Sequence, residues 1–251
     1  GGGIFSSNPN EFIFTSNSLN SNTAESLDSQ RDAYSYVGGL FHTSPKDQSA
    51  VISGNTLTDN KVTSNSSVRN SNSYGGAVYL TGAAGSSLNI TSNTASGNHF
   101  DIEGESSSTN AAGFGGTFYI SSSGLLNFTS NTVSNSINTV DDTLNAAGFG
   151  GALYLNSGAF GEVNLTSNTL TGNSITTDAN QNSTLRGGGA YLRGSSSSTF
   201  TLNNINVSSN TLSSTGDRAA SALGGGVYSE LTKLSLTSSV FNTNTASSDA
   251  G

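Results

Sequence analysis

Cysteine is absent from this chain of 251 residues, and proline occurs only twice. Without cysteine, disulfides contribute nothing to stability, and cysteine usage gives no indication of the redox compartment. No run of about 18 apolar residues is present, so the sequence predicts no membrane-spanning helix and no direct insertion into a membrane. The start, Gly1 to Gly3, does not resemble a signal peptide, so we expect any targeting signal to lie outside this segment.

Charged side chains are also scarce. Eight Lys and Arg residues stand against 16 Asp and Glu residues, which gives a net charge of −8. No basic patch is available to neutralise phosphates, so we expect no nucleic-acid partner and no binding to anionic membranes. Hydrophobic residues make up only 32% of the chain. An aperiodic sequence of this kind would predict disorder, whereas a periodic one predicts a narrow core enclosed by polar walls.

The sequence is strongly periodic. One cassette returns seven times at intervals of roughly 37 residues, a period typical of solenoids, propellers and repeat arrays. Each cassette contains a glycine pair, an apolar segment with an aromatic ring, and a later segment that ends in apolar-x-x-Asn. The cassettes begin at Gly1, Val37, Gly75, Gly115, Gly150, Gly187 and Gly224.

Within a cassette, apolar and polar residues alternate over short runs bounded by Gly, Asn and Ser, which predicts strands. Each cassette offers two or three short strands and no hairpin signal, so a β-solenoid is favoured over a propeller. We therefore predict an all-β fold, a right-handed parallel β-helix of about seven coils with variable loop inserts. It forms a single domain over residues 1–251, as a segment of a longer repeat array. The handedness follows the general preference of parallel crossovers.

In such a fold, like residues of successive coils stack about 4.8 Å apart along the axis. Alternation assigns Val78 and Leu80 to the core, and Ala77 and Tyr79 to the outer face. An outward column of aromatic rings is therefore expected. It is interpreted as a spine that stiffens the solenoid, with a carbohydrate platform or a lateral packing surface as the alternative. Its members are Phe5, Phe41, Tyr79, Tyr119, Tyr154, Tyr191 and Tyr228.

A second column consists of asparagines. Asn tolerates the left-handed backbone of a sharp corner, and stacked amides can hydrogen-bond from coil to coil. The glycine pair is expected at another corner, where φ is positive or backbones approach too closely for a Cβ atom. The predicted asparagine column contains Asn17, Asn55, Asn93, Asn131, Asn168, Asn210 and Asn244.

Asn-x-Ser/Thr sequons recur along the chain, and each is a candidate N-glycosylation site. Four of them, Asn89, Asn127, Asn164 and Asn206, are predicted to share one strand position and to point outward in a column. The alternative is that the repeat template generates sequons that are never modified. The candidates are Asn65, Asn89, Asn127, Asn164, Asn182 and Asn206.

Residues suited to catalysis or metal binding are few. The two histidines, His42 and His99, lie in different cassettes, and the acidic pair Asp141-Asp142 is expected in a solvated insert. Asp101, Glu103 and Glu105 alternate in another insert and are interpreted as surface residues that could at most bind a cation weakly.

Calcium-binding nonapeptides, HExxH, P-loops and nucleophile elbows do not occur. The sequence therefore predicts no catalytic residue, no cofactor and no metal. Ice binding is not favoured, since no regular Thr-x-Thr pair on a flat face is apparent.

The two columns together resemble the repeats of the chlamydial polymorphic outer-membrane proteins, with their Gly-Gly-Ala-(Ile/Leu/Val) and Phe-x-x-Asn motifs. Gly75-Gly76-Ala77-Val78 and Gly150-Gly151-Ala152-Leu153 match the first motif. The second motif is matched from Phe14 to Asn17, from Phe128 to Asn131 and from Phe241 to Asn244. The resemblance implies a right-handed parallel β-helix displayed outside the cell, often as an adhesin passenger. No C-terminal membrane barrel is visible.

These observations favour an extracellular or cell-surface structural protein, a rigid spacer or a filament subunit that stacks end to end with copies of itself. One alternative is an adhesin whose inserts, such as residues 98–114 and 174–186, bind a host or glycan partner. The other, less favoured, is an enzyme acting on polysaccharides, because such reactions need clustered carboxylates.

Overall fold

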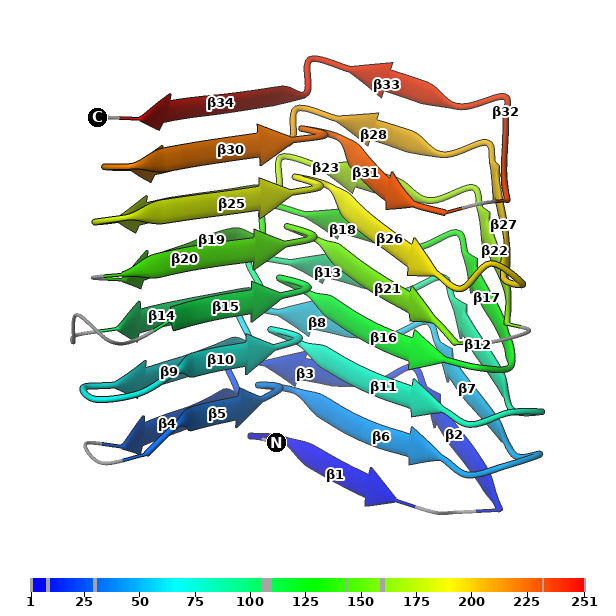
Figure 1. Cartoon of the computed structure of the whole chain (residues 1–251). Coiled ribbons are helices and arrows are strands. Elements are labelled where there is room, and N and C mark those ends of the chain that lie inside the picture. The colour runs from blue at the N-terminus through cyan, green and yellow to red at the C-terminus, as the bar shows by residue number, and fades with distance from the viewer. Residues whose placement is uncertain are drawn as a thin grey trace.

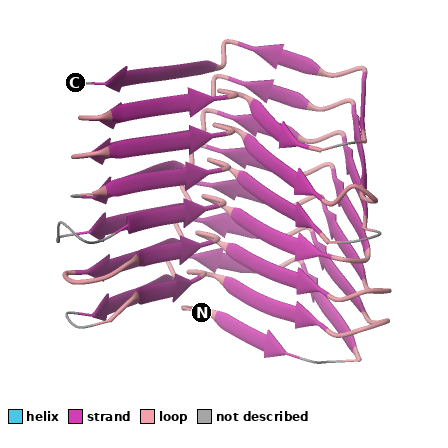
Figure 2. Ribbon diagram, in the orientation of Figure 1, coloured by secondary structure: helices cyan, strands magenta, loops and turns pink. Residues whose placement is uncertain are grey.

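The computed structural model describes residues 2–7, 10–28, 31–104, 110–142, 144–158, 161–231 and 233–250. Every regular element in these ranges is a β-strand, and the strands wind into a parallel β-solenoid (Figures 1 and 2). In Figure 1 the chain crosses the near side from left to right, returns behind and rises by one layer per turn, which makes the coil right-handed. The predicted fold class is confirmed.

The strands form five sheets, each containing one strand from every turn. Sheet A contains β1 (Ile4–Ser7), β6 (Leu40–Ser44), β11 (Val78–Gly82), β16 (Phe118–Ser122), β21 (Leu153–Ser157), β26 (Ala190–Gly194) and β31 (Val227–Glu230). Sheet B contains β2 (Glu11–Thr15), β7 (Ser49–Ser53), β12 (Ser87–Thr91), β17 (Leu125–Thr129), β22 (Glu162–Thr166), β27 (Thr199–Asn203) and β32 (Leu234–Thr237). Sheet C contains β3 (Ser18–Asn20), β8 (Thr56–Thr58), β13 (Thr94–Ser96), β18 (Thr132–Ser134), β23 (Thr169–Thr171), β28 (Asn206–Ser208) and β33 (Val240–Asn242).

The remaining strands form two further sheets. Sheet D contains β4 (Thr23–Asp28), β9 (Lys61–Ser66), β14 (His99–Gly104), β19 (Ile137–Asp142), β24 (Ser174–Ala179), β29 (Thr211–Gly216) and β34 (Thr245–Ala250). Sheet E contains β5 (Ala33–Tyr36), β10 (Ser71–Tyr74), β15 (Asn110–Phe114), β20 (Asn145–Phe149), β25 (Asn182–Arg186) and β30 (Ala219–Leu223). The chain thus makes about six turns, close to the seven predicted, and a complete turn has five strands rather than two or three.

Side chains alternate between the interior and the surface along each strand, as a half-buried strand requires. Val78 and Leu80 are fully buried, as predicted. Ala77 is also fully buried, so its assignment to the outer face is wrong. It lies in the corner before β11, where strand alternation does not yet apply.

The interior contains two apolar clusters. The larger follows the axis between sheets A, B and C, and the smaller lies between sheets D and E. The smaller cluster is narrow and partly polar: the hydroxyls of Ser64 and Ser73 lie 3.0 Å apart inside it. Buried hydroxyls that bond one another cost little, because neither is left unsatisfied. A core of this shape explains how so polar a sequence can fold.

Sheet C is entered and left through corners of two residues in every turn. The first corner residue has a positive φ, as at Ser92 (55°) and Gly97 (66°). The second is usually an asparagine, such as Asn93 or Asn98, whose backbone is not left-handed. The prediction that this asparagine adopts the left-handed conformation is therefore wrong. The residue before it turns the chain, and the asparagine side chain points into the solenoid.

The glycine pair forms the corner between sheets E and A, as predicted. Gly75 has a φ of 64°, and Val37 adopts 51° at the same corner of the preceding turn. At the second glycine, the backbone of the next coil is too close for a side chain: a Cβ atom on Gly116 would collide with the carbonyl oxygen of Gly151. Close backbone approach thus excludes any larger residue.

The connections of variable length lie between sheets D and E and between sheets A and B. The prediction of loop inserts at 98–114 and 174–186 is wrong. The described residues of these ranges largely form the strands β14, β15, β24 and β25. Polar composition suggested loops there, but the alternation of outward polar residues with inward small ones is that of strands.

Two asparagine ladders, rather than one, run along the axis. The first occupies the corner between sheets B and C and contains Asn17, Asn55, Asn93, Asn131 and Asn168. The second occupies the corner between sheets C and D and contains Asn22, Asn60 and Asn98 and, beyond Ser136, Asn173, Asn210 and Asn244. Ser136 interrupts this row of amides, and its backbone N–H donates to Oδ1 of Asn173.

The assignment of Asn210 and Asn244 to the first ladder is therefore wrong. The two ladders lie five residues apart in similar sequence surroundings, and Ile205 replaces the first-ladder asparagine in the sixth coil. The repeat alignment consequently slips by five residues there.

Asn93 illustrates how each amide is satisfied. Its Oδ1 accepts hydrogen bonds from the backbone N–H of Asn55 at 3.0 Å and from the Asn55 amide at 2.9 Å. Its Nδ2 donates to the carbonyl of Ile52 and to Oδ1 of Asn131, both at 2.9 Å. One side chain thus links three successive coils, and all of its polar atoms are bonded.

Replacing Asn93 with Ala should lower the free energy of unfolding by about 2–4 kcal/mol, because buried groups of Asn55 and Ile52 lose their partners. Urea titration measures the change. Asn127→Ala is the matched control: Asn127 lies on the outer face of β17, and its loss should cost about 1 kcal/mol or less. Equal losses in the two variants would contradict a special role of the buried ladder.

Candidate functional site

The predicted aromatic column is present on the outer face of sheet A. Phe5, Phe41, Tyr79, Tyr119, Tyr154, Tyr191 and Tyr228 are register partners in successive coils. Neighbouring ring centroids lie 4.8 Å apart from Phe5 to Tyr119 and 5.7 Å apart at Tyr228. The planes of Tyr79 and Tyr119 are within 3° of parallel. The rings therefore use their faces to contact one another.

A second aromatic column was missed from the sequence. It lies on sheet E beside the first and contains Tyr36, Tyr74, Phe114 and Phe149. Its rings meet those of the first column edge to face; Tyr74 and Tyr119 are 5.3 Å apart at 86°. The signal that would have found it is an aromatic residue directly before the first residue of the E–A corner. The two columns together cover this corner with aromatic contacts, each favourable by about 1 kcal/mol.

Toward the C-terminal turns, an arginine replaces the aromatic residue of the second column. Arg186 is the register partner of Phe149 in the next coil. Its guanidinium carbon lies 5.2 Å from the ring centroid of Tyr228. Its Nη1 lies 2.5 Å from one carboxylate oxygen of Glu230, and the hydroxyl of Tyr191 donates to the other oxygen at 2.7 Å. A cation on a ring face continues the aromatic stacking without a ring.

A small hollow opens where the two columns meet these charges. We call it the corner hollow; it is lined by Phe114, Phe149, Tyr154, Arg186, Tyr191, Arg193 and Glu230. Burial raises the pKa of Tyr154 and of Tyr191, so both phenols remain protonated donors at neutral pH. Because the ring faces are already stacked, a ligand would meet ring edges, hydroxyls and Arg193 rather than a flat aromatic platform.

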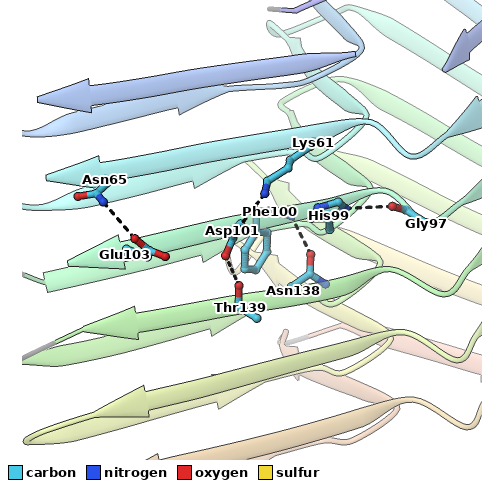
Figure 3. Close-up of polar contacts among 9 residues, drawn as sticks. All are labelled: Lys61, Asn65, Gly97, His99, Phe100, Asp101, Glu103, Asn138 and Thr139. Atoms are coloured by element: carbon cyan, nitrogen blue, oxygen red, sulfur yellow. Dashed lines mark hydrogen bonds and ion pairs between the residues drawn. The ribbon is translucent and has the colours of Figure 1, made fainter. Parts of the chain in front are cut away.

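The outer face of sheet D carries most of the remaining polar contacts (Figure 3). Nζ of Lys61 lies 3.0 Å from a carboxylate oxygen of Asp101, and the hydroxyl of Thr139 donates to the other oxygen. Partial burial raises the pKa of Asp101, but the bonds from Thr139 and Lys61 outweigh it and hold that pKa below its usual range. Asp101 is therefore an ion-pair partner rather than an acid.

A column of carboxylates lies beside this ion pair. Glu103, Asp141 and Asp178 are register partners in three successive coils. Burial and the Asp178 carboxylate raise the pKa of Asp141. Within the described ranges, no group of three or more His, Cys, Asp and Glu side chains is placed to hold a metal ion. Glu105, which was grouped with Asp101 and Glu103, lies outside the described residues.

Asp141 and Asp142 do not form a solvated acidic pair. Both belong to β19, where consecutive side chains point to opposite faces: Asp141 is exposed and Asp142 is buried. The backbone N–H of Leu144 donates to the Asp142 carboxylate at 3.1 Å. Their assignment to an insert is wrong, and the two carboxylates cannot act together on one substrate.

The histidines also lie apart. His99 faces outward on β14, with Nδ1 3.0 Å from the carbonyl of Gly97 (Figure 3). His42 is fully buried in the large core, stacked on Phe12 at 4.1 Å between ring centroids. Its two ring nitrogens contact the hydroxyls of Ser6 and Ser44 at 3.3 and 2.8 Å. Burial lowers the pKa of His42 to about 4.

Three of the sequons form the predicted outward column. Asn89, Asn127 and Asn164 are register partners on sheet B. The Asn127 amide donates to Asn89 at 2.8 Å, and the Asn164 amide donates to Asn127 at 3.2 Å. Asn206 does not belong to this column, because it begins β28 in sheet C and pairs with Thr169. The same slip of five residues explains the error.

The last two sequons lie on other faces. Asn65 is on the outer side of β9, where its amide donates to Glu103 at 3.1 Å (Figure 3). Asn182 is exposed at the start of β25.

Comparison of the chain with protein-family models, with curated proteins and with solved structures finds no significant match. Among the described residues, no helix is long and apolar enough to cross a membrane.

His42 should make stability depend on pH. Its pKa is 6.5 in the unfolded chain and about 4 in the fold, so the unfolded state binds the proton first as pH falls. The free energy of unfolding should therefore decrease between pH 6.5 and 4, by up to about 3 kcal/mol. Urea titrations across this range measure the decline.

The His42→Leu variant should lose this part of the pH dependence, because leucine occupies the same position in the next coil at Leu80. His99→Gln is the matched control and should keep it. A wild-type profile that His42→Leu leaves unchanged would refute the assignment.

Proposed function

We propose that this chain is a rigid structural rod of an extracellular or cell-surface protein, acting as a spacer or as a filament subunit. The observation that carries the proposal is the continuity of stacked side chains along the axis. The first asparagine ladder runs without a break from Asn17 to Asn168, and the sheet A rings run from Phe5 to Tyr228. Each turn contacts only its neighbours, so stiffness accumulates with every added coil.

We further propose that the rod continues by stacking head to tail. The outermost layers expose apolar residues such as Phe5, which is 65% exposed, and Leu236, which is 49% exposed. A further coil, or a second copy of the chain, would cover these side chains and extend the strand ladders. Repeated head-to-tail contacts of this kind do not close and therefore generate filaments.

The extracellular location is supported by the resemblance to chlamydial polymorphic outer-membrane proteins. The glycine motif falls at one structural position, because Gly75 and Gly150 both lie at the corner between sheets E and A. Phe14 to Asn17 and Phe128 to Asn131 lead into the first ladder, whereas Phe241 to Asn244 leads into the second. The outward-facing sequons, among them the half-buried Asn89 and Asn127, would carry glycans if the protein is secreted by a eukaryotic cell.

Pulling the chain along its axis in a force spectrometer tests the rod. We expect coil-by-coil lengthening at high force, and a lower force for Asn93→Ala than for its outward control Asn127→Ala. Seven stacked strands span only about 30 Å along the axis, so head-to-tail stacking at high protein concentration is needed to form long particles. Negative-stain images should then show straight filaments of constant width. Smooth extension at low force, or compact round particles, would contradict the proposal.

A second candidate function is adhesion, which the corner hollow favours. Arg193 is exposed at its rim, beside the hydroxyl-bearing rings of Tyr154 and Tyr191. An exposed guanidinium next to phenol donors suits an acidic glycan, since carboxylates and sulfates accept several hydrogen bonds at once.

A glycan array tests adhesion. Binding of acidic glycans should be lost in Arg193→Gln and retained in Arg218→Gln, where an exposed arginine elsewhere on the rod is neutralised. Equal binding by the two variants, or none by the wild type, would exclude the corner hollow as an adhesin site.

A further inference from the structure

Sheet C presents a regular array of hydroxyl groups. In four successive coils the two outward positions are Thr or Ser, and the residue between them is apolar and buried. The pairs are Thr56 and Thr58, Thr94 and Ser96, Thr132 and Ser134, and Thr169 and Thr171. Thr-x-Thr itself occurs in two of these coils, at Thr56 and Thr169, and Thr-x-Ser occurs in the other two. The pairs lie nearly 40 residues apart in the sequence, and the register between neighbouring coils places them side by side on sheet C.

The array has a fixed two-dimensional mesh. Hydroxyls two residues apart on a strand are separated by about 6.7 Å, and equivalent hydroxyls of neighbouring coils by about 4.8 Å. Strand β8 and its neighbours are joined to sheets B and D by two-residue corners in every turn, so no insert interrupts the face. The two asparagine ladders flank it on both sides. Their hydrogen bonds keep the spacing and the orientation of neighbouring coils constant.

The hydroxyls of the first residue in each pair are rigid and available, whereas those of Thr58, Ser134 and Thr171 take part in hydrogen bonds within the protein. Threonine has a stiff χ1 because it is β-branched, and the buried residues between the pairs, such as Leu57 and Val133, anchor each strand. In the part of the chain that the structure describes, the hydroxyls of Thr56, Thr94, Thr132 and Thr169 make no hydrogen bond to protein. They are free to bond to water.

The face also lacks the groups that other extended ligands need. No strand of sheet C contains a charged residue, so a mineral or polyanion surface would find no counter-charge. The outward positions of β8, β13, β18 and β23 carry no aromatic ring on which a sugar could stack. A flat, uncharged mesh of hydroxyl and methyl groups fits a lattice of water.

We propose that the outer face of sheet C binds ice. The mesh of Thr and Ser groups is close to the repeat of oxygen atoms on the prism faces of hexagonal ice, so waters held on the protein coincide with lattice positions. Ordering a bridging water costs up to about 2 kcal/mol in solution. On a growing crystal that water is already ordered, and the binding of many such sites at once becomes favourable.

Thermal hysteresis, the gap between the melting and freezing points of a single ice crystal, tests the proposal with the whole chain. The wild type should produce a gap and a faceted crystal. Thr132→Tyr, at the centre of the mesh, should lose most of that gap because its ring lifts the lattice off the face. Thr184→Tyr places the same ring on the outer face of sheet E and should leave the gap unchanged.

Circular dichroism of each variant verifies the fold. If Thr132→Tyr does not fold, Thr94→Lys, at a more exposed position of the same mesh, replaces it and should lose the gap in the same way. A wild-type chain with no hysteresis and no effect on crystal shape would overturn the proposal. So would equal losses in Thr132→Tyr and Thr184→Tyr.

Discussion

Each coil of this protein lies one strand spacing above the previous one, about 4.8 Å, with equivalent residues in register. This constraint decides which side chain each position accepts. Where backbones of neighbouring coils nearly touch, as at Gly116 and Gly151, only glycine fits. Where a buried corner leaves backbone groups unpaired, as around Asn93, an amide that both donates and accepts is required. Where the position is outward and partly covered, a flat ring such as Tyr119 stacks at the same spacing.

The same constraint explains the stability of so polar a chain. Hydrophobic residues account for 32% of it, yet Leu80, Ile90 and Phe118 are fully buried in a continuous cluster. Most buried amides and hydroxyls add little cost because they have a partner in the next coil or across the core. The Ser86 hydroxyl is an exception among the described residues. His42 differs from these groups because it can ionise, and its burial disfavours the charged ring. Stability and its pH dependence therefore arise from the same packing.

The faces of the solenoid differ because variation is confined to particular corners. Connections between sheets A and B and between D and E vary in length, whereas those around sheet C are constant. The constant face carries the hydroxyl mesh, and the E–A corner carries the aromatic columns and the corner hollow. Sheet D carries the ion pair of Lys61 with Asp101 and the carboxylates that follow it (Figure 3). The faces of the solenoid therefore differ in chemistry although every coil follows the same path.

The period, the glycine corner and the sheet A rings could be predicted because each recurs at a constant offset within every cassette. Tyr79 and Gly75, for example, are recognisable from their immediate neighbours. The sequence alone thus determined the solenoid, its outward aromatic column and the inward positions of Val78 and Leu80. It did not separate the two asparagine ladders, because two similar Asn corners five residues apart allow either alignment, and Ile205 removes the residue that distinguishes them.

Only the tertiary structure decided which residues of different coils are neighbours. It moved Asn206 from sheet B to sheet C, placed Asp141 and Asp142 on opposite faces, and aligned Thr56, Thr94, Thr132 and Thr169 in one row. The physical reason is that a surface spanning several coils depends on register between segments nearly 40 residues apart. Local pattern determines the inward or outward direction of a side chain, whereas hydrogen bonding between coils determines what lies beside it.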